Sequence, residues 1–577
     1  MDNKQSFLKG AAILTAATIL VKIIGMFYKI PLGNVLGAVG LSYFMTAYSI
    51  FNPISSLSTA GFPVAVSCLA SENAARGRWR DVKRIFRVSF TLFVVTGLVG
   101  FALMFFGAGR LAGMVGNPGA ALSVAAMAPA IFFCCIMSAY RGYYQGMNNM
   151  SPTAASQVVE SVAKLVCGIG FAFRFLNRGL EEYARQGTVY GAVAADEAAA
   201  GLLALPYAAA GAVLGVTVST AMGAAFLFLR HALRGDGVSR ERLRRSPAPA
   251  GYTATLKRLV LLALPVCLAS AVAHVTNLID VATIINRVGV AMQRDSAAVL
   301  GMYRGLLPQG LPEAGVPSFL YGAFSYTNSL FNLVPALTAP LGISALPGVA
   351  SLWALGSRRQ SVERIQSVVK LAALAAIPAG LGIAALAEPI LSLLYPLRLQ
   401  ETAIAAPLLR GMGVAGVFVG ITTPMASVFQ ALGRADIPVK LMGMGAAVKV
   451  GCNYLLLAVP ALNIRAASLG TTACYAFILL AGCAWLGSVT GERVRMGKVF
   501  LKPLICGILC ALAANTSFAL LHRLIPSRAV CLCAVAIGGV IYVIFALFLR
   551  VISKNEAEML LKGKKIVKIL EKLSFLG

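Results

Sequence analysis

Long apolar runs recur along the whole chain and are separated by short polar gaps. Each run holds about 20 residues, the length that an α-helix needs to cross the hydrocarbon core of a bilayer. The pattern predicts an all-α polytopic membrane protein. It indicates about fourteen transmembrane helices, near residues 10–30, 35–57 (continuing helically to about 70), 84–107, 120–142, 153–175, 201–229, 257–285, 323–354, 366–394, 402–431, 437–459, 464–488, 499–521 and 528–550.

The basic residues in the gaps indicate the orientation of these helices. Strongly basic gaps, at 76–84, 230–245, 358–364 and 493–498, alternate with gaps such as 31–40 that carry one basic residue or none. Cytoplasmic loops of membrane proteins are rich in lysine and arginine. We therefore expect an even number of spans with both termini in the cytoplasm.

Composition narrows the classes of function. Of 577 residues, 58% are hydrophobic and only 12% are charged, whereas soluble proteins carry about 25% charged residues. The net charge of +29 comes mainly from the gap segments, so we expect no nucleic-acid partner. The twelve cysteines lack the spacing of zinc ligands, and the three histidines are widely separated. We expect no metal, no organic cofactor and no enzymatic activity.

The two halves of the chain show a weak internal repeat. Pro63 and Pro347 are separated by the same interval as Arg80 and Arg364, and the interval between Lys164 and Lys449 is one residue longer. We predict two six-helix lobes related by a pseudo-two-fold axis along the membrane normal, plus two C-terminal helices. The expected parts are an N-lobe (1–230), a basic cytoplasmic linker (231–256), a C-lobe (257–488), the last two spans (499–550) and a basic tail (551–577), which is either an amphipathic helix on the inner leaflet or a disordered segment.

Two lysines interrupt the first apolar run. Lys22 and Lys29 are seven residues apart and share a helical face, separated by about 10.5 Å along the axis. A lysine at the centre of a membrane helix costs about 2.5–3.5 kcal/mol on insertion scales. The pair predicts a positive column that faces a cavity and binds an anionic ligand. In the alternative, Lys29 extends to the lipid headgroups and has no ligand role.

Five further charged residues lie inside or beside apolar runs. Arg410 and Lys449 are candidate cations of the second half, although Arg410 could instead pair with a helix end. Glu160 and Lys164 are an i, i+4 pair with either a structural or a functional role. Asp280 is an intramembrane carboxylate, and we expect it to be a coupling-ion site or a counter-ion to the lysines.

Prolines mark helices that can bend. Pro53 lies near the end of the second predicted span and Pro63 follows it, and Pro335 and Pro340 occupy the corresponding stretch of the second half. A proline inside a helix removes one backbone hydrogen bond and bends the helix. We expect these four residues to be hinges, or alternatively ordinary packing kinks.

Three motifs carry a resemblance to a known family. They are FLKGAAILTAATILVKIIGMFYKIPLG (7–33), GFPVAVSCLASE (61–72) and YRGYYQGMNNMSPTAASQVVESVAKLV (140–166). Over almost the full chain they resemble the polysaccharide-transporter branch of the multidrug/oligosaccharidyl-lipid/polysaccharide exporter superfamily, in particular the stage V sporulation protein B and MurJ-like flippases. The resemblance implies essential cations in the first span, where the flippases use arginine and this chain has Lys22 and Lys29.

The resemblance and the charges together predict a flippase of the bacterial plasma membrane. It would move an undecaprenyl-diphosphate-linked glycan, most simply the peptidoglycan precursor lipid II, through a cationic cleft by alternating access. Na⁺, H⁺ or the membrane potential would drive it, and its expected partners are the lipid-linked glycan, the bilayer and cell-wall synthases. The alternatives are a flippase for another lipid-linked polysaccharide unit and a drug/cation antiporter of the same superfamily, which would require buried carboxylates rather than lysines.

Overall fold

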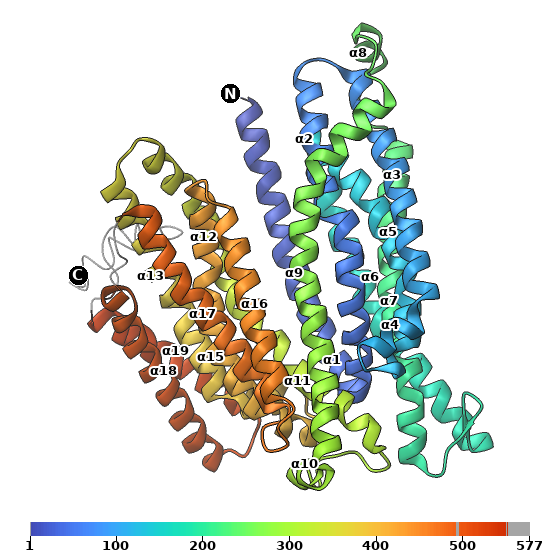
Figure 1. The fold of residues 1–577 in the computed structure, drawn as a ribbon, viewed down its shortest axis with the longest axis vertical. Coiled ribbons are helices and arrows are strands. Elements are labelled where there is room, and N and C mark those ends of the chain that lie inside the picture. Colours follow the sequence, from blue (N-terminus) through green and yellow to red (C-terminus); the bar gives the residue numbers. More distant parts are fainter. Residues whose placement is uncertain (1, 492–495, 550, 552–577) are drawn as a thin grey trace. The chain divides into compact units, whose positions relative to one another are not determined.

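The computed structural model describes residues 2–491, 496–549 and 551. The predicted amphipathic tail therefore lies outside the described residues, except for Val551. The chain is helical almost throughout, which confirms the predicted all-α class (Figure 1). It divides into two compact units: unit 1 comprises residues 1–286 and 307–322, and unit 2 comprises residues 287–306 and 323–577. The first boundary between the units falls after Asn286, within the long helix Tyr252–Arg294. The expected division of the chain at the linker 231–256 stays a prediction.

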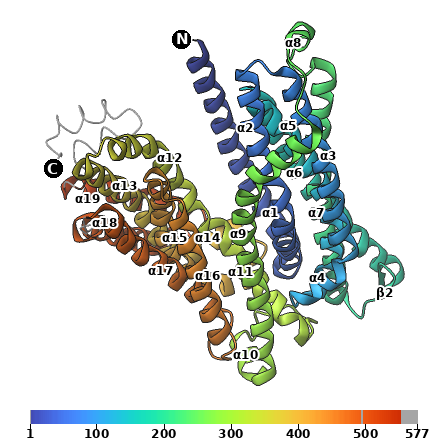
Figure 2. The same cartoon turned by 45° about the horizontal axis from the view of Figure 1, so that its top comes forward.

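Unit 1 is built mainly from the first nine helices. Its elements are α1 (Asp2–Thr59), α2 (Phe62–Ala75), α3 (Trp79–Phe106), α4 (Ala108–Met114), the 3-10 helix η1 (Pro118–Ala120), α5 (Ala121–Gly146), α6 (Ser151–Gln186), strands β1 (Thr188–Val189) and β2 (Ala192–Val193), α7 (Glu197–Arg234), α8 (Arg240–Arg245) and most of α9 (Tyr252–Arg294). Helix α5 packs on α3 and α7, and α6 packs on α1 and α7 (Figure 2).

Unit 2 contains most of the remaining helices. They are α10 (Ser296–Met302), η2 (Glu313–Gly315) and α11 (Val316–Phe331), of which η2 and the start of α11 belong to unit 1, then α12 (Leu333–Ala354), α13 (Arg358–Ala385), α14 (Ala387–Leu394), α15 (Leu399–Ala431), α16 (Asp436–Leu456), α17 (Arg465–Thr490), α18 (Met496–Leu524) and α19 (Val530–Phe548). Helix α15 packs on α12, α13 and α17. The last two helices, α18 and α19, pack on each other and on α13, where the Tyr542 hydroxyl donates a 2.6 Å hydrogen bond to the Leu374 carbonyl.

Every predicted apolar run falls on helical chain, but the helices do not follow the runs one to one. Among the described residues, eleven helical segments are long and apolar enough to cross a membrane. Helices α6 and α16 occupy two predicted runs without being among these eleven. The two runs at 10–30 and 35–57 are both within α1, which is interrupted at Gly37 (φ 62°). The number of membrane crossings and the symmetry of the lobes stay predictions.

Two helix breaks lie next to the predicted hinge prolines. The expected continuation of the second span to residue 70 is wrong, because the helix stops at Thr59 and Pro63 lies in the first turn of α2. The other break is at Asn332, and Pro335 follows it in the first turn of α12. Pro53 and Pro340 remain inside α1 and α12. A proline lacks the N–H that would continue the preceding helix, which explains the breaks before Pro63 and Pro335.

Close backbone contacts fasten the α1–α2 break within unit 1. A β-carbon on Gly61 would lie 2.3 Å from the Ala263 carbonyl oxygen and 2.8 Å from Cys267 Sγ, both on α9. Glycine is therefore required where α9 crosses the break. Helices α6 and α7 approach each other in the same way at Gly168 and Gly215. Such contacts between small residues are typical of membrane helices, which gain little from apolar burial against lipid.

Candidate functional site

A cluster of cationic and aromatic side chains lies between α1 and α6 in unit 1. A β-carbon on Gly168 of α6 would lie 2.6 Å from the Tyr28 ring, so the two helices approach closely there. Lys164 is one helical turn before Gly168 and is thereby brought to the same ring. The second segment of α1 completes the cluster, because it contributes Tyr48. We call Tyr28, Lys29, Tyr48 and Lys164 the lysine–tyrosine cluster.

Lys164 is held by neutral aromatic groups. Its Nζ donates a 2.6 Å hydrogen bond to the Tyr48 hydroxyl. It also lies 5.1 Å from the ring centre of Tyr28 and 4.9 Å from that of Tyr48. A cation–π contact away from water contributes about 2 kcal/mol, and a hydrogen bond to a charged group about 1.5–3 kcal/mol. These contacts are of the same order as the cost of placing a lysine within the membrane. They stabilise the ammonium without cancelling its charge.

Glu160 has a different partner from the predicted one. Its Oε2 atom lies 2.9 Å from Arg141 Nη2, and Arg141 Nε donates to the Ser156 hydroxyl at 3.1 Å. The two charges of the expected i, i+4 pair, Glu160 and Lys164, thus bind different groups. Within the described part of the chain, Lys164 forms no ion pair. Glu160 lies near enough to Lys164 for their charges to interact, but its ion pair is with the Arg141 guanidinium. With Lys29, the four charged groups therefore carry a net positive charge.

Arg141 is a residue that the sequence reasoning missed. It is the only charged residue of the run 120–142, and it also belongs to the motif at 140–166. A lone charge in an apolar run requires a partner, and that signal pointed to Arg141. The identity of its partner, nineteen positions away in sequence, could not be read from periodicity.

The two lysines of the first span differ in their surroundings. Lys29 is half-buried and close enough to Lys164 for their positive charges to interact. Lys22 is exposed on the surface of unit 1. The structure therefore brings Lys29, but not Lys22, to the lysine–tyrosine cluster.

The remaining candidates are dispersed. Asp280 is half-buried on α9 of unit 1. Lys449 is half-buried on α16 of unit 2. Arg410 of α15 is 62% exposed and lies 3.9 Å from Glu388 in the first turn of α14, which is the alternative role considered for it. Their functional roles stay predictions.

The fold and this cluster define a multi-pass helical membrane protein with charged groups inside its helices. The model of the polysaccharide biosynthesis protein family matches residues 7–308, and the chain belongs to that family. Stage V sporulation protein B of Bacillus subtilis (strain 168) is 25% identical over 96% of this chain and 97% of its own length. The lipid II flippase MurJ of the same organism is 22% identical over 82% of each chain. A solved structure of lipid II flippase MurJ, in an inward closed conformation, has the same fold: its TM-score is 0.63 at 14% identity, over 93% of this chain and 98% of that one. The resemblance inferred from the motifs is confirmed.

Proposed function

We propose that this protein is a flippase that moves a lipid-linked glycan across the plasma membrane. The similarity to a sporulation protein over 96% of the chain and to a lipid II flippase over 82% of it supports this class of activity. We propose lipid II, an undecaprenyl-diphosphate-linked peptidoglycan precursor, as the substrate. Alternating access between the two membrane faces is the proposed route, with Pro53, Pro63, Pro335 and Pro340 as hinges.

The lysine–tyrosine cluster is the observation that carries the proposal. A lipid-linked glycan crosses the membrane with a diphosphate, whose charge is negative. The Lys164 ammonium is positioned by Tyr48, and Glu160 is held by Arg141. Lysine binds phosphate as a point charge and does not need two-pronged geometry. Lys164 and Lys29 would therefore take the diphosphate, and Lys22 would extend the positive surface along α1.

The membrane potential has the right sign to drive this movement. A negative group that moves from a negative interior to a positive exterior gains about 2.3 kcal/mol per charge per 100 mV. A diphosphate with two charges would gain about twice that amount. Asp280 would be a site for Na⁺ or H⁺ coupling, or a counter-ion that holds the lysines when no substrate is bound.

Another lipid-linked polysaccharide unit is the second candidate, because it would present the same diphosphate. A drug/cation antiporter is a weaker candidate. An organic cation would be repelled by the two lysines of the cluster, and the neighbouring carboxylate, Glu160, is engaged by Arg141.

The test uses bacterial cells that are depleted of their own lipid II flippase. The protein and its Lys164→Ala variant are expressed, and lipid II exposed outside is quantified with an added lipid II-cleaving enzyme. Lys440→Ala is the matched control, since Lys440 is an exposed lysine of α16 that pairs with Asp436. We expect wild type and the control to restore cleavage and Lys164→Ala to fail at equal protein level.

Two other results would be informative. Failure of the well-expressed wild type would exclude lipid II and leave the other lipid-linked glycans. Full activity of Lys164→Ala would keep the function and contradict the role of the cluster.

A further inference from the structure

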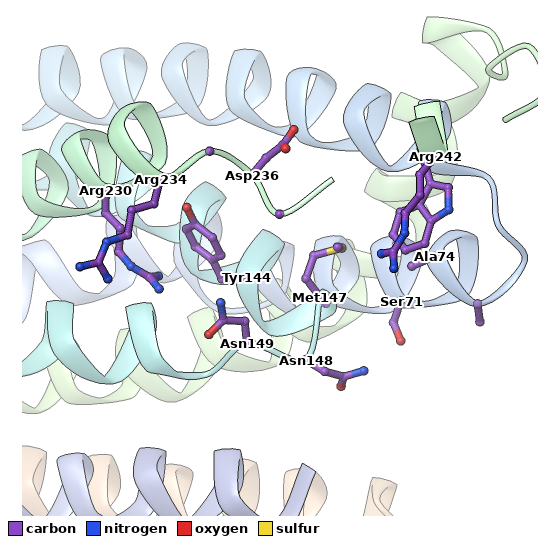
Figure 3. A pocket seen from close by; sticks show the side chains of 15 residues that line it. Ser71, Ala74, Tyr144, Met147, Asn148, Asn149, Arg230, Arg234, Asp236 and Arg242 are labelled. Atoms are coloured by element: carbon purple, nitrogen blue, oxygen red, sulfur yellow. The ribbon is translucent and has the colours of Figure 1, made fainter. Parts of the chain in front are cut away.

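A second basic site lies at one end of unit 1, outside the lysine–tyrosine cluster. It is a pocket of about 530 Å³, within the usual range for small-molecule sites. The pocket lies where α5 and α7 end and where the linker to α9 begins (Figure 3). Among its lining residues are Arg230, Arg234 and Arg242, together with Trp79 and Asn149. The gaps around it are the strongly basic ones, so we predict that it faces the cytoplasm.

The walls of the pocket are fixed by hydrogen bonds. The segment after α7 is tied to α3 by Asp236, whose Oδ2 lies 2.8 Å from Lys83 Nζ, and to α5 by Tyr143, whose hydroxyl donates to the Asp236 carbonyl at 3.2 Å. Burial opposes ionisation of Asp236, but the hydrogen bonds from Lys83 and from the Val238 N–H outweigh it and hold its pKa below the ordinary value. The carboxylate is therefore charged and already matched.

The α8 segment is fastened equally well. The Arg80 N–H donates to the Ser246 hydroxyl at 3.1 Å, and Arg80 Nε donates to the Leu243 carbonyl at 3.0 Å. The Ala250 N–H donates to Asp81 Oδ1 at 2.7 Å. The pocket is thus a formed cavity between docked segments of unit 1.

The lining holds three arginines and one carboxylate, Asp236, which is already paired with Lys83. In the described part of the chain, none of Arg230, Arg234 and Arg242 forms an ion pair. Arg230 lies over the Tyr144 ring, 5.3 Å from its centre, and its Nη1 atom is buried without a hydrogen-bond partner. An unsatisfied buried donor of a charged group is costly, so this N–H requires an acceptor.

The pocket has an anion-binding end and, opposite it, an end lined by apolar, aromatic and basic side chains. Figure 3 shows Arg230 and Arg234 side by side next to Tyr144 and Asn149, with Met147 farther along and Arg242 beyond it. The Arg242 guanidinium lies 5.1 Å from the centre of the Trp79 ring. Paired guanidinium groups are the preferred partners of phosphate oxygens, and an aromatic ring with Met147 accommodates an organic group.

We propose that this pocket binds a phosphate ester, with the phosphate on Arg230 and Arg234 and the organic part toward Met147 and Trp79. The bound phosphate joins the end of α7 to the α5–α6 loop through Asn149. Arg242 brings α8 to the same ligand, so that binding further stabilises the docked 235–250 segment against the rest of unit 1. The ester is either the headgroup of an anionic phospholipid or a soluble cytoplasmic phosphate.

Fluorescence of Trp79 tests the proposal in the purified full-length protein. The chain has three tryptophans, so a Trp353→Phe/Trp485→Phe background leaves Trp79 as the reporter. One arm titrates glycerol 3-phosphate and adenosine 5′-monophosphate in phosphatidylcholine nanodiscs. The other arm compares nanodiscs of phosphatidylcholine with nanodiscs that contain phosphatidylglycerol, without soluble phosphate.

We expect a saturable change of Trp79 emission in one arm, which identifies the source of the phosphate. Arg230→Gln/Arg234→Gln should weaken the response roughly tenfold or more, since two charge-assisted contacts are lost. Arg244→Gln is the control, because Arg244 shares α8 with Arg242 and lies outside the lining. Hydrogen exchange of residues 235–247 should slow on binding in wild type and in the control.

Two results would overturn the proposal. One is the absence of any change of Trp79 emission in both arms with well-folded protein. The other is a response that Arg230→Gln/Arg234→Gln leaves intact. The Arg230→Lys/Arg234→Lys variant guards against a folding defect: it keeps the charge, and we expect it to retain part of the binding.

Discussion

Each unit holds a charged side chain against a tyrosine hydroxyl, and the two charges are balanced in opposite ways. In unit 1, Lys164 donates a 2.6 Å hydrogen bond to Tyr48 and otherwise meets aromatic rings. In unit 2, the Tyr326 hydroxyl donates a 2.6 Å hydrogen bond to Glu401, which is 7% exposed, and Arg398 lies 3.7 Å from the same carboxylate.

The difference separates a structural charge from an available one. Glu401 has a neutral donor and a cation, so its charge is cancelled within unit 2. Lys164 has neutral partners that orient its ammonium and leave its positive field intact. A buried charge that is paired mainly stabilises the fold, because removing one partner leaves the other as an uncompensated buried charge. A charge that is oriented but uncancelled is ready for a ligand of opposite sign.

The largest expected effect is on the stability of unit 2. Glu401→Leu should lower the free energy of unfolding by about 3 kcal/mol, because it removes both the ion pair with Arg398 and the hydrogen bond from the Tyr326 hydroxyl. Thermal unfolding in detergent measures this change. Glu388→Gln is the control, since Glu388 is 70% exposed and 3.9 Å from Arg410, and it should unfold like wild type. Equal unfolding temperatures for Glu401→Leu and wild type would show that Glu401 does not stabilise unit 2.

The next effect is on transport and should leave stability nearly unchanged. Lys164→Ala should reduce lipid II exposure in depleted cells at least tenfold, because the diphosphate loses a positioned cation. Its unfolding temperature should stay close to that of wild type, since removing an uncancelled buried charge also removes a desolvation cost. A loss of transport that is explained by a loss of folded protein would show that Lys164, like Glu401, has a structural role.

Matched tyrosine variants sharpen the comparison. Tyr48→Phe keeps the ring and removes the acceptor for Lys164, so transport should fall about three- to tenfold, as expected for one hydrogen bond. Tyr326→Phe removes the donor to Glu401 and should instead destabilise the protein by about 1–3 kcal/mol. Transport and unfolding assays on both variants check this. An identical pattern in the two variants would abolish the distinction between the two tyrosines.

The smallest effect is expected at the start of α1. Lys22 is exposed on unit 1, so Lys22→Ala should lower transport only about two- to threefold, by weakening the positive surface beyond Lys29. The same cellular assay measures it, with Lys440→Ala as the control. A loss as large as that of Lys164→Ala would make Lys22 a direct phosphate ligand and widen the site.

Sequence patterns predicted the class of fold and the positions of the helices. Membrane helices satisfy their backbone groups internally, so the pattern of apolar runs locates most of them. The break at Ala60–Gly61 was missed, because it depends on Pro63 and on the close approach of α9 at Gly61. The division of the chain into two compact units after Asn286 reflects tertiary packing rather than composition.

The candidate site was only half predictable. Lys29 and Lys164 were recognisable as charges in apolar runs. Tyr48 was not, because it lies 116 positions from Lys164 in sequence. Glu160 was expected to pair with its i+4 neighbour, yet Arg141 binds it. The pocket around Arg230 was also missed, since it depends on how the 235–250 linker folds back onto α3.

Binding of undecaprenyl diphosphate to the purified protein is the most direct test of the central claim. Its affinity is compared with that of undecaprenyl monophosphate for wild type, Lys164→Ala and Lys440→Ala. The account predicts that wild type and Lys440→Ala prefer the diphosphate, and that Lys164→Ala binds the diphosphate at least tenfold more weakly. Equal affinity of all three proteins for the diphosphate would contradict it.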